Sequence, residues 1–206
     1  MLMTRYRLFA AFAPVLLLLT ACGVNSIPTA EEQAKAKWAD VQASFQRRAN
    51  LIPNLVETTR AAAASEQEIL QGVTEARANA TRITVSPEQL TDPAAMQRFS
   101  EAQSRLSAAI IPLQRLQEAY PNLQSQQNFA TLMQQLEGTE NRINVAIRDY
   151  NEAVRAYNTE IRTFPSVIGA RIIYGSQPMV PYQAVTPGAE VAPTVNFDRP
   201  AAGNNQ

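Results

Sequence analysis

Two residue types limit the chemistry open to this chain: histidine, which is absent, and cysteine, which occurs once. Without histidine there is no Ser-His-Asp triad, no histidine general base and no Glu-x-x-His di-iron site. The single cysteine, Cys22, cannot form an internal disulfide, and zinc sites that need several nitrogen or sulfur ligands are excluded. We therefore assign no catalytic, cofactor-binding or metal-binding residue.

Carboxylates are the remaining candidates for chemistry. Glu137 and Glu140 are three residues apart, so in a helix they share a face. Three other carboxylates could meet them across a bundle: Glu57, Glu66 and Glu75. Such groups can perform acid/base work or hold a hard divalent cation. Because Arg142 lies two residues from Glu140, as is typical of salt-bridged faces, a carboxylate-based hydrolase or cation-binding bundle ranks below a non-enzymatic protein.

Cys22 has a different expected role, as the attachment point of a lipid. Residues 1–21 have the pattern of a secretion signal, with Arg5 and Arg7 before the apolar run Leu8 to Leu19. The run is too short for a typical membrane span, and it ends in Leu-Thr-Ala-Cys, the pattern that precedes a lipidated cysteine in bacterial lipoproteins. We expect Cys22 to become the acylated first residue of the mature chain, held at the membrane. An ordinary cleaved signal or an uncleaved anchor is the alternative.

The charge of the chain argues against nucleic acid as a partner. Lysine plus arginine and aspartate plus glutamate are equal at 18 each, so the formal charge is zero, and loss of residues 1–21 with their two arginines makes it −2. A chain this balanced has no field that would gather a polyanion. The expected partners are the membrane, through Cys22, and another protein of the envelope. The identity of that protein and the oligomeric state stay open.

The elements that must position these groups are long helices. Residues 126–165 contain no internal proline before Pro165, and apolar side chains recur every three or four positions over roughly 58 Å of helix. Residues 30–84 carry a similar stripe, and its phase does not change at Pro53. A kinked continuous helix is favoured there over a turn that starts a new helix. A third helix runs from about Pro93 to Tyr120, with a kink expected at Pro112.

These stripes predict an all-α fold, an up-and-down bundle of three to four long helices, with the first helix kinked or broken at Pro53. The turn at 84–93 holds two helix-start signals, Ser86 followed by Gln89 and Asp92 followed by proline. The core prediction is a set of large side chains buried between helices: Trp38, Phe45, Leu136, Ile143, Tyr150 and Tyr157.

The predicted domain boundaries follow from this pattern. Residues 1–21 are the signal peptide, 22–29 a lipidated linker, 30–170 the bundle, and 171–206 a proline-rich tail that should be disordered. The apolar stretch 167–174 could cap the bundle, contact a partner or touch a membrane.

Four segments resemble the LemA family of bacterial envelope proteins. They are RRANLIPNLVETTR (47–60), VTEARANA (73–80), AYPNL (119–123) and LEGTENRINVAIRDYNEAVRAYNTEIRTFPS (136–166). The resemblance spans roughly residues 30–170 and implies a bundle of long helices held at the membrane outside the cytoplasm. It supplies no catalytic residues. The chain departs from the family pattern in its lipobox, which replaces a transmembrane helix, in Pro112, and in the stretch VIGARIIYG.

The function that these observations favour is a non-enzymatic, membrane-tethered scaffold or adaptor in the bacterial cell envelope, with its domain outside the cytoplasm. Gly23, rather than aspartate, follows Cys22, which favours the outer over the inner membrane if the organism has both. The balanced charge argues against the long helices lying on lipid themselves, and the stretch 167–174 is the one place where such contact could hold.

Overall fold

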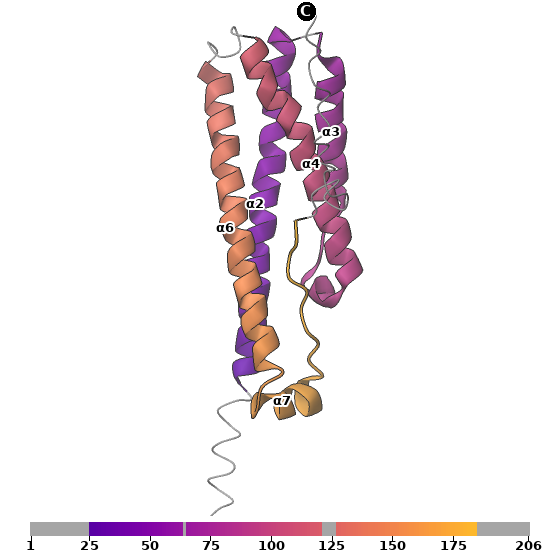
Figure 1. Ribbon diagram of the computed structural model, residues 1–206, viewed down its shortest axis with the longest axis vertical. Coiled ribbons are helices and arrows are strands. Elements are labelled where there is room, and N and C mark those ends of the chain that lie inside the picture. The colour runs from indigo at the N-terminus through magenta and orange to yellow at the C-terminus, as the bar shows by residue number, and fades with distance from the viewer. Residues whose placement is uncertain (1–24, 64, 121–126, 185–206) are drawn as a thin grey trace, which may run out of the picture.

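The structure is a computed structural model that describes residues 25–63, 65–120 and 127–184. Four long helices run up and down along one axis (Figure 1): α2 (Ser26–Ala62), α3 (Gln67–Arg82), α4 (Pro93–Ala119) and α6 (Gln127–Glu160). Short helical segments follow as η1 (Pro87–Thr91), α7 (Ser166–Gly169) and the single π-helical turn η2 (Ala170–Tyr174). The described residues contain no strand, so the all-α prediction is confirmed.

The first helix passes through Pro53 but ends well before residue 84. Pro53 lies inside α2, which stops at Ala62, and α3 then runs back alongside it, so the expectation of one helix over 30–84 is wrong. The reason is that a helical stripe keeps its phase whether the chain continues or reverses, provided that both parts face the same core. The residues at the break, 61–64, are all alanine, and they offer no large side chain that would anchor a longer rod.

Helix α2 tolerates Pro53 because another side chain replaces its missing donor. Proline has no backbone N–H, so the carbonyl oxygen of Ala49, four residues earlier, loses its helical partner. Arg77 of α3 donates from Nε to this oxygen at 2.7 Å, and Ala49 is buried. The orphaned acceptor in α2 is thereby satisfied from the neighbouring helix.

The turn before α4 matches its sequence signals. The backbone N–H of Ser86 donates to Oε1 of Gln89 at 3.0 Å, and that of Ala94 donates to Oδ1 of Asp92 at 2.9 Å. Both contacts satisfy backbone donors that a helix start leaves free. The predicted starts at Ser86 and Asp92 are therefore confirmed.

The buried side chains form two cores along the axis. The upper core, named from its place in Figure 1, lies among all four long helices and includes Leu55, Leu106, Phe129 and Leu136. The lower core includes Trp38, Phe99, Tyr150 and Tyr182. All six side chains of the core prediction are buried: Trp38, Phe45, Leu136, Ile143, Tyr150 and Tyr157. That prediction is confirmed.

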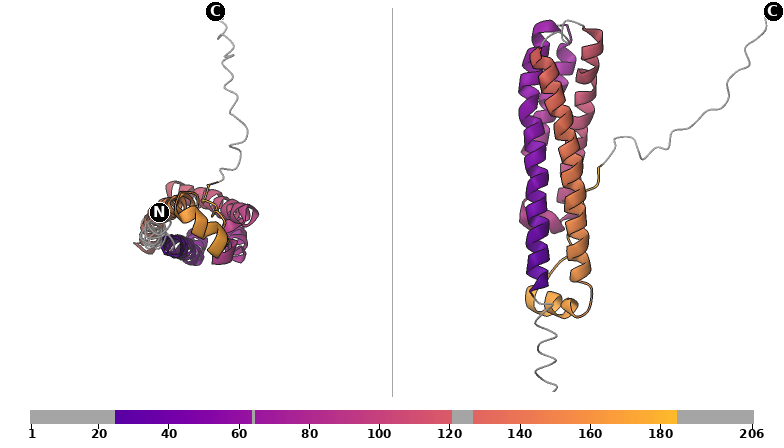
Figure 2. Two further views of the ribbon diagram at one scale, coloured as in Figure 1. Left: turned by 90° about the horizontal axis from the view of Figure 1, so that it is seen from below. Right: turned by 90° about the vertical axis from the view of Figure 1, so that its left-hand side faces the viewer.

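Helices α3 and α4 stop short of the lower end, where α2 and α6 continue as a pair (Figures 1 and 2). An extended segment, residues 176–184, runs back up along this open side and adds Met179 and Tyr182 to the lower core. The expectation that residues 171–206 are disordered is therefore wrong for 171–184, while 185–206 lie outside the described residues. The start of α2 at Ser26 also shortens the expected linker 22–29, since Ile27 is already buried.

Candidate functional site

Cys22, the predicted lipidation site, lies outside the described residues, as does the predicted signal peptide 1–21. Its nearest described neighbours are at the foot of α2, which places the point of entry of the chain at the lower end of the bundle (Figure 1). None of the helices in the described ranges has the length and apolar character needed to cross a bilayer.

The five candidate carboxylates are not brought together. Glu57 pairs with Arg60 on its own helix at 3.1 Å, and Glu66 accepts a hydrogen bond from the Tyr120 hydroxyl at 3.0 Å. Glu137 and Glu75 are exposed on different helices, whereas Glu140 faces an arginine. Within 25–63, 65–120 and 127–184, no group of three or more acidic, histidine or cysteine side chains is arranged to hold a metal ion. The convergence that a carboxylate enzyme requires is not formed.

Glu140 instead belongs to a buried polar layer around Arg48, whose side chain is 1% exposed. From α2, Arg48 donates through Nη1 to Ser107 Oγ at 2.7 Å and to Glu140 Oε1 at 3.1 Å. Its Nη2 donates to the side-chain oxygen of Gln103 at 2.8 Å, and its guanidinium carbon lies 5.0 Å from the centre of the Phe45 ring. A buried charge is tolerated only when it is paired and hydrogen-bonded, and this one meets both conditions.

The layer connects all four long helices. Gln103 of α4, which binds Arg48, also donates from Nε2 to the carbonyl oxygen of Ala80 in α3 at 3.3 Å, while Glu140 belongs to α6. The layer lies between the lower and upper cores, and Arg48 Nε is left without a partner there. Because its hydrogen bonds need one alignment of the helices, the layer fixes the register of the bundle.

The lower core is closed by two asparagines of α6 that hold the extended segment. Asn158 donates from Nδ2 to the carbonyl oxygen of Met179 at 2.8 Å and accepts from its N–H at 2.9 Å. Asn151 makes the same pair of bonds with Tyr182, at 3.0 and 2.8 Å. Each carboxamide thus replaces one backbone partner of a β-ladder. We call Asn151 and Asn158 the asparagine ladder.

The tyrosines that precede each asparagine complete this contact. The hydroxyl of Tyr150 donates to the carbonyl oxygen of Val180 at 2.8 Å, and that of Tyr157 to Gln177 at 3.2 Å. Burial raises the pKa of both phenols. Burial also raises the pKa of Tyr182 to about 12, with nearby Arg48 acting in the opposite direction. All three therefore stay protonated near neutral pH.

Tyr150 and Tyr157 belong to the predicted set of buried side chains, whereas the sequence predicts no role for Asn151 and Asn158. Both Tyr-Asn pairs recur seven residues apart on α6, at 150–151 and 157–158, so they lie on one face of the helix. An amide repeated at helical spacing next to a buried aromatic residue was the available signal. This repeat of amides indicates that the face of α6 carrying them binds the backbone of another segment, in addition to packing against apolar side chains.

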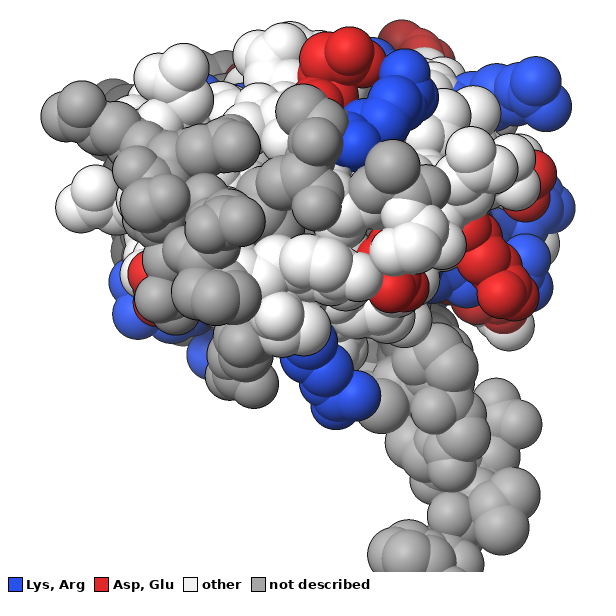
Figure 3. Space-filling model, turned by 90° about the horizontal axis from the view of Figure 1, so that it is seen from above, with Lys and Arg blue, Asp and Glu red and all other residues white. Residues whose placement is uncertain are grey.

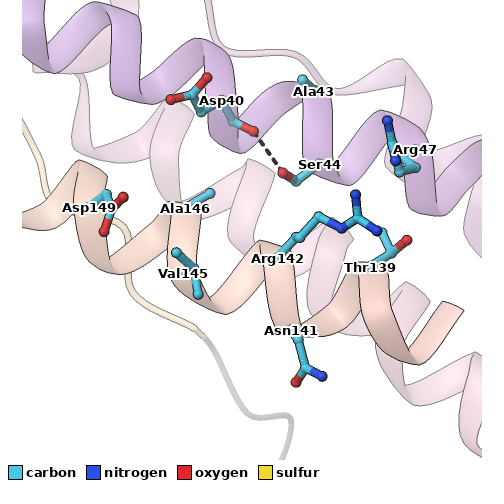
Figure 4. A pocket seen from close by; sticks show the side chains of 10 residues that line it. All are labelled: Asp40, Ala43, Ser44, Arg47, Thr139, Asn141, Arg142, Val145, Ala146 and Asp149. Carbon is cyan, nitrogen blue, oxygen red and sulfur yellow. Dashed lines mark hydrogen bonds between the residues drawn. The ribbon is translucent and has the colours of Figure 1, made fainter. Parts of the chain in front are cut away.

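A groove of about 500 Å³ runs along the outside of the α2/α6 pair. Asp40 and Asp149 lie toward one end of it, and Arg47 and Arg142 toward the other (Figure 4). Lys37 lies 3.7 Å from each of the two aspartates, whereas neither arginine forms an ion pair with another described residue. The other lining residues are small or apolar, or have a polar group that does not point into the groove. They are Ala43, Ser44, Thr139, Asn141, Val145 and Ala146.

The groove offers an outward-facing surface, whereas the Arg48 layer and the asparagine ladder direct their hydrogen bonds into the molecule. Ser44 donates to the carbonyl oxygen of Asp40 in its own helix at 2.9 Å, and Asn141 points away from α2 (Figure 4). Val145 is 47% exposed on the groove wall. Arg142 donates from Nε to the carbonyl oxygen of Gly138 at 3.4 Å, but neither Arg142 nor Arg47 has a carboxylate partner among the described residues. Two such guanidinium groups beside an exposed apolar side chain are suited to an acidic, partly apolar protein surface.

Comparison with known proteins gives one family. The family model described as the LemA family matches residues 37–197, which is most of the chain and includes the asparagine ladder and the extended segment. A search of curated proteins finds no significant match.

Proposed function

The chain belongs to the LemA family, and we propose that it is a membrane-tethered, non-enzymatic scaffold of the bacterial envelope that binds another protein along the α2/α6 groove. The observation that carries the proposal is the combination of groups that line this groove. Arg47 and Arg142, which have no carboxylate partner among the described residues, lie there beside the exposed apolar side chain of Val145.

A scaffold needs rigidity, and the bundle supports it in three ways. The α2/α6 pair runs side by side over the full height of the molecule (Figure 2). The Arg48 layer couples the four long helices, and the asparagine ladder closes the lower half. A partner bound to α2 and α6 would therefore meet a surface already fixed in shape, which lowers the entropic cost of binding.

The tether is the second part of the proposal. Cys22, acylated at the sulfur and at its new amino terminus, would hold the chain stably, because two or more acyl chains give lasting attachment where one does not. We expect Cys22→Ala to abolish incorporation of a fatty-acid probe and to leave the chain unprocessed or released. Unchanged labelling of the variant would contradict the lipoprotein assignment.

The partner surface is tested with a photo-crosslinking amino acid in intact envelopes. Placed at Val145, it should give a discrete adduct with another envelope protein. Ile111 on α4 is the matched control, because its exposed fraction is the same, 47%, and it lies outside the groove. An adduct at Val145 that disappears in an Arg47→Glu/Arg142→Glu background supports the groove. Equal adducts from Val145 and Ile111, or none from Val145, would contradict it.

A further inference from the structure

We propose that the lower end of the bundle, residues 164–174, inserts its apolar side chains into the surface of the lipid bilayer, as a second attachment beside the tether. This deepens the proposed function and rests on its membrane tether. The segment comprises the turn after α6, α7 and η2, which together cross the end of the bundle (Figures 1 and 2). We call it the apolar end.

Large apolar side chains are exposed here and almost nowhere else in the described chain. Seven large hydrophobic side chains of the described residues are exposed, and five belong to this segment: Phe164, Ile168, Ile172, Ile173 and Tyr174. Phe164 and Ile172 are 80% and 79% exposed. The other two, Ile111 and Val145, lie singly on α4 and α6. Scattered apolar residues are ordinary on a surface, but a gathering of five on one short segment indicates a partner.

The segment is held in place with its small residues inward. Ser166, Gly169 and Ala170 are buried, while the isoleucines between and after them face out. Ser166 Oγ and Ser26 Oγ both donate to Glu160 Oε1, each at 2.5 Å. Small residues are therefore buried and large apolar residues are exposed, which is the opposite of usual packing. The segment exposes an apolar surface and is held by these hydrogen bonds to the ends of α2 and α6.

The bilayer is the occupant that the connectivity favours. Ser26, which shares Glu160 with Ser166, is four residues from Cys22 in the sequence. Four residues span at most about 14 Å even when fully extended. A lipid attached at Cys22 would therefore hold the apolar end within reach of the bilayer surface. Among residues 25–63, 65–120 and 127–184, nothing comparable brings a protein partner to this end.

The charges of the segment also suit a membrane surface. Residues 161–175 contain Arg162 and Arg171, both exposed, and no aspartate or glutamate. Cations that flank an apolar patch favour anionic headgroups, and Tyr174 is of the residue class enriched at the interface. On the opposite end of the bundle, lysine or arginine and acidic side chains lie close together (Figure 3). The apolar end itself carries arginine and no carboxylate.

The test uses the full processed chain reconstituted into vesicles of phosphatidylethanolamine and phosphatidylglycerol. A nitroxide is attached at Ile168→Cys or, as the matched control, at Ile111→Cys, because these two residues are 49% and 47% exposed. Collisions with oxygen, which concentrates in lipid, are compared with collisions with a water-soluble nickel complex. Wild-type chain carried through the same labelling gives the background from Cys22.

We expect the oxygen-to-nickel ratio at Ile168→Cys to be several-fold higher than at Ile111→Cys, as for a group inserted 5–10 Å into the interface. Ile172→Cys repeats the measurement in case the first variant folds poorly. Equal ratios at the two positions on vesicle-bound chain would overturn the membrane contact, while a retained fatty-acid label on Cys22 would leave the tether standing. If the chain is not acylated, the tether is overturned, and a water-like ratio at Ile168→Cys then overturns the contact as well. Shielding from both reagents would instead assign the apolar end to a contact with a second copy of the chain, and would also overturn the membrane contact.

Discussion

Around the upper core, four helices enclose the buried side chains, whereas around the lower core α2 and α6 share that task with η1, the start of α4 and the extended segment 176–184. The upper core is closed by the packing of four helices, whose backbone groups bond mainly within each helix. The lower core needs the asparagine ladder, because an extended segment cannot satisfy its own backbone groups as a helix can. One long helix, α6, therefore packs against other helices in its upper half and binds an extended backbone segment in its lower half.

The Arg48 layer separates the two cores, and its removal should give the largest effect. Arg48→Ala leaves Gln103, Ser107 and Glu140 without their shared donor and opens a cavity, so we expect a loss of about 3–5 kcal/mol in the free energy of unfolding. Arg48→Met, which keeps the volume and removes the charge, should cost much less. Chemical denaturation checks both, with exposed Arg47→Ala as the control. If Arg48→Ala unfolds like the wild type, the layer does not hold the register.

The asparagine ladder should matter only to the lower core. Asn158→Ala removes the two hydrogen bonds to the backbone of Met179, whose side chain is buried, and should cost about 1–3 kcal/mol. Amide hydrogen exchange should rise in residues 176–184 and stay unchanged in the upper core. Asn141→Ala, on the same helix but pointing away from α2, is the control. Equal exchange in Asn158→Ala and wild type would mean that Met179 and Tyr182 hold the segment by packing alone.

In the upper half of the bundle, the contribution of the contact between Arg77 and Ala49 to stability should depend on the presence of Pro53. Arg77→Ala leaves a buried carbonyl unpaired next to Pro53, and we expect a loss of about 1–3 kcal/mol. In a Pro53→Ala background the helix regains its own N–H, so the same change should cost clearly less. Denaturation of the four chains of this double-mutant cycle measures the coupling. Purely additive losses would show that Arg77 does not replace the donor that proline lacks.

The smallest expected effect is a pH dependence of the stability of the lower end of the bundle. Hydrogen bonds from Ser166 and Ser26 lower the pKa of Glu160 below its ordinary value of 4.5. The unfolded chain then takes up the proton first, so the stabilisation is present above about pH 4.5 and is lost as the pH falls through the lowered pKa. Hydrogen exchange near Ile27 should increase over that range while the upper core is unaffected. In Glu160→Gln this pH dependence should vanish, and its persistence would assign the effect to another group.

The features that could be predicted from the sequence are those that follow from whether a residue faces the core. Apolar stripes located the helices and the buried Trp38 and Tyr150, because a side chain that faces a core must recur at helical spacing. The reversal after Ala62 was missed, since the stripe reads the same in either direction. The order of 176–184 was missed because it depends on asparagines far along the chain, and composition alone indicated a disordered tail. The pairing of Glu140 with Arg48 depends on the register of helices, which no local pattern specifies.

The central claim is that one end of the bundle faces the membrane and the α2/α6 groove stands away from it. Energy transfer between a dye in the lipid headgroups and a dye on the chain measures this directly, with the second dye at Glu68→Cys near the upper end or at Ile172→Cys on the apolar end. Since α6 alone spans 34 residues, or about 51 Å of helix, we predict strong transfer at residue 172 and weak transfer at residue 68. Equal transfer at the two positions would mean that the bundle lies flat on the membrane, and would contradict the account.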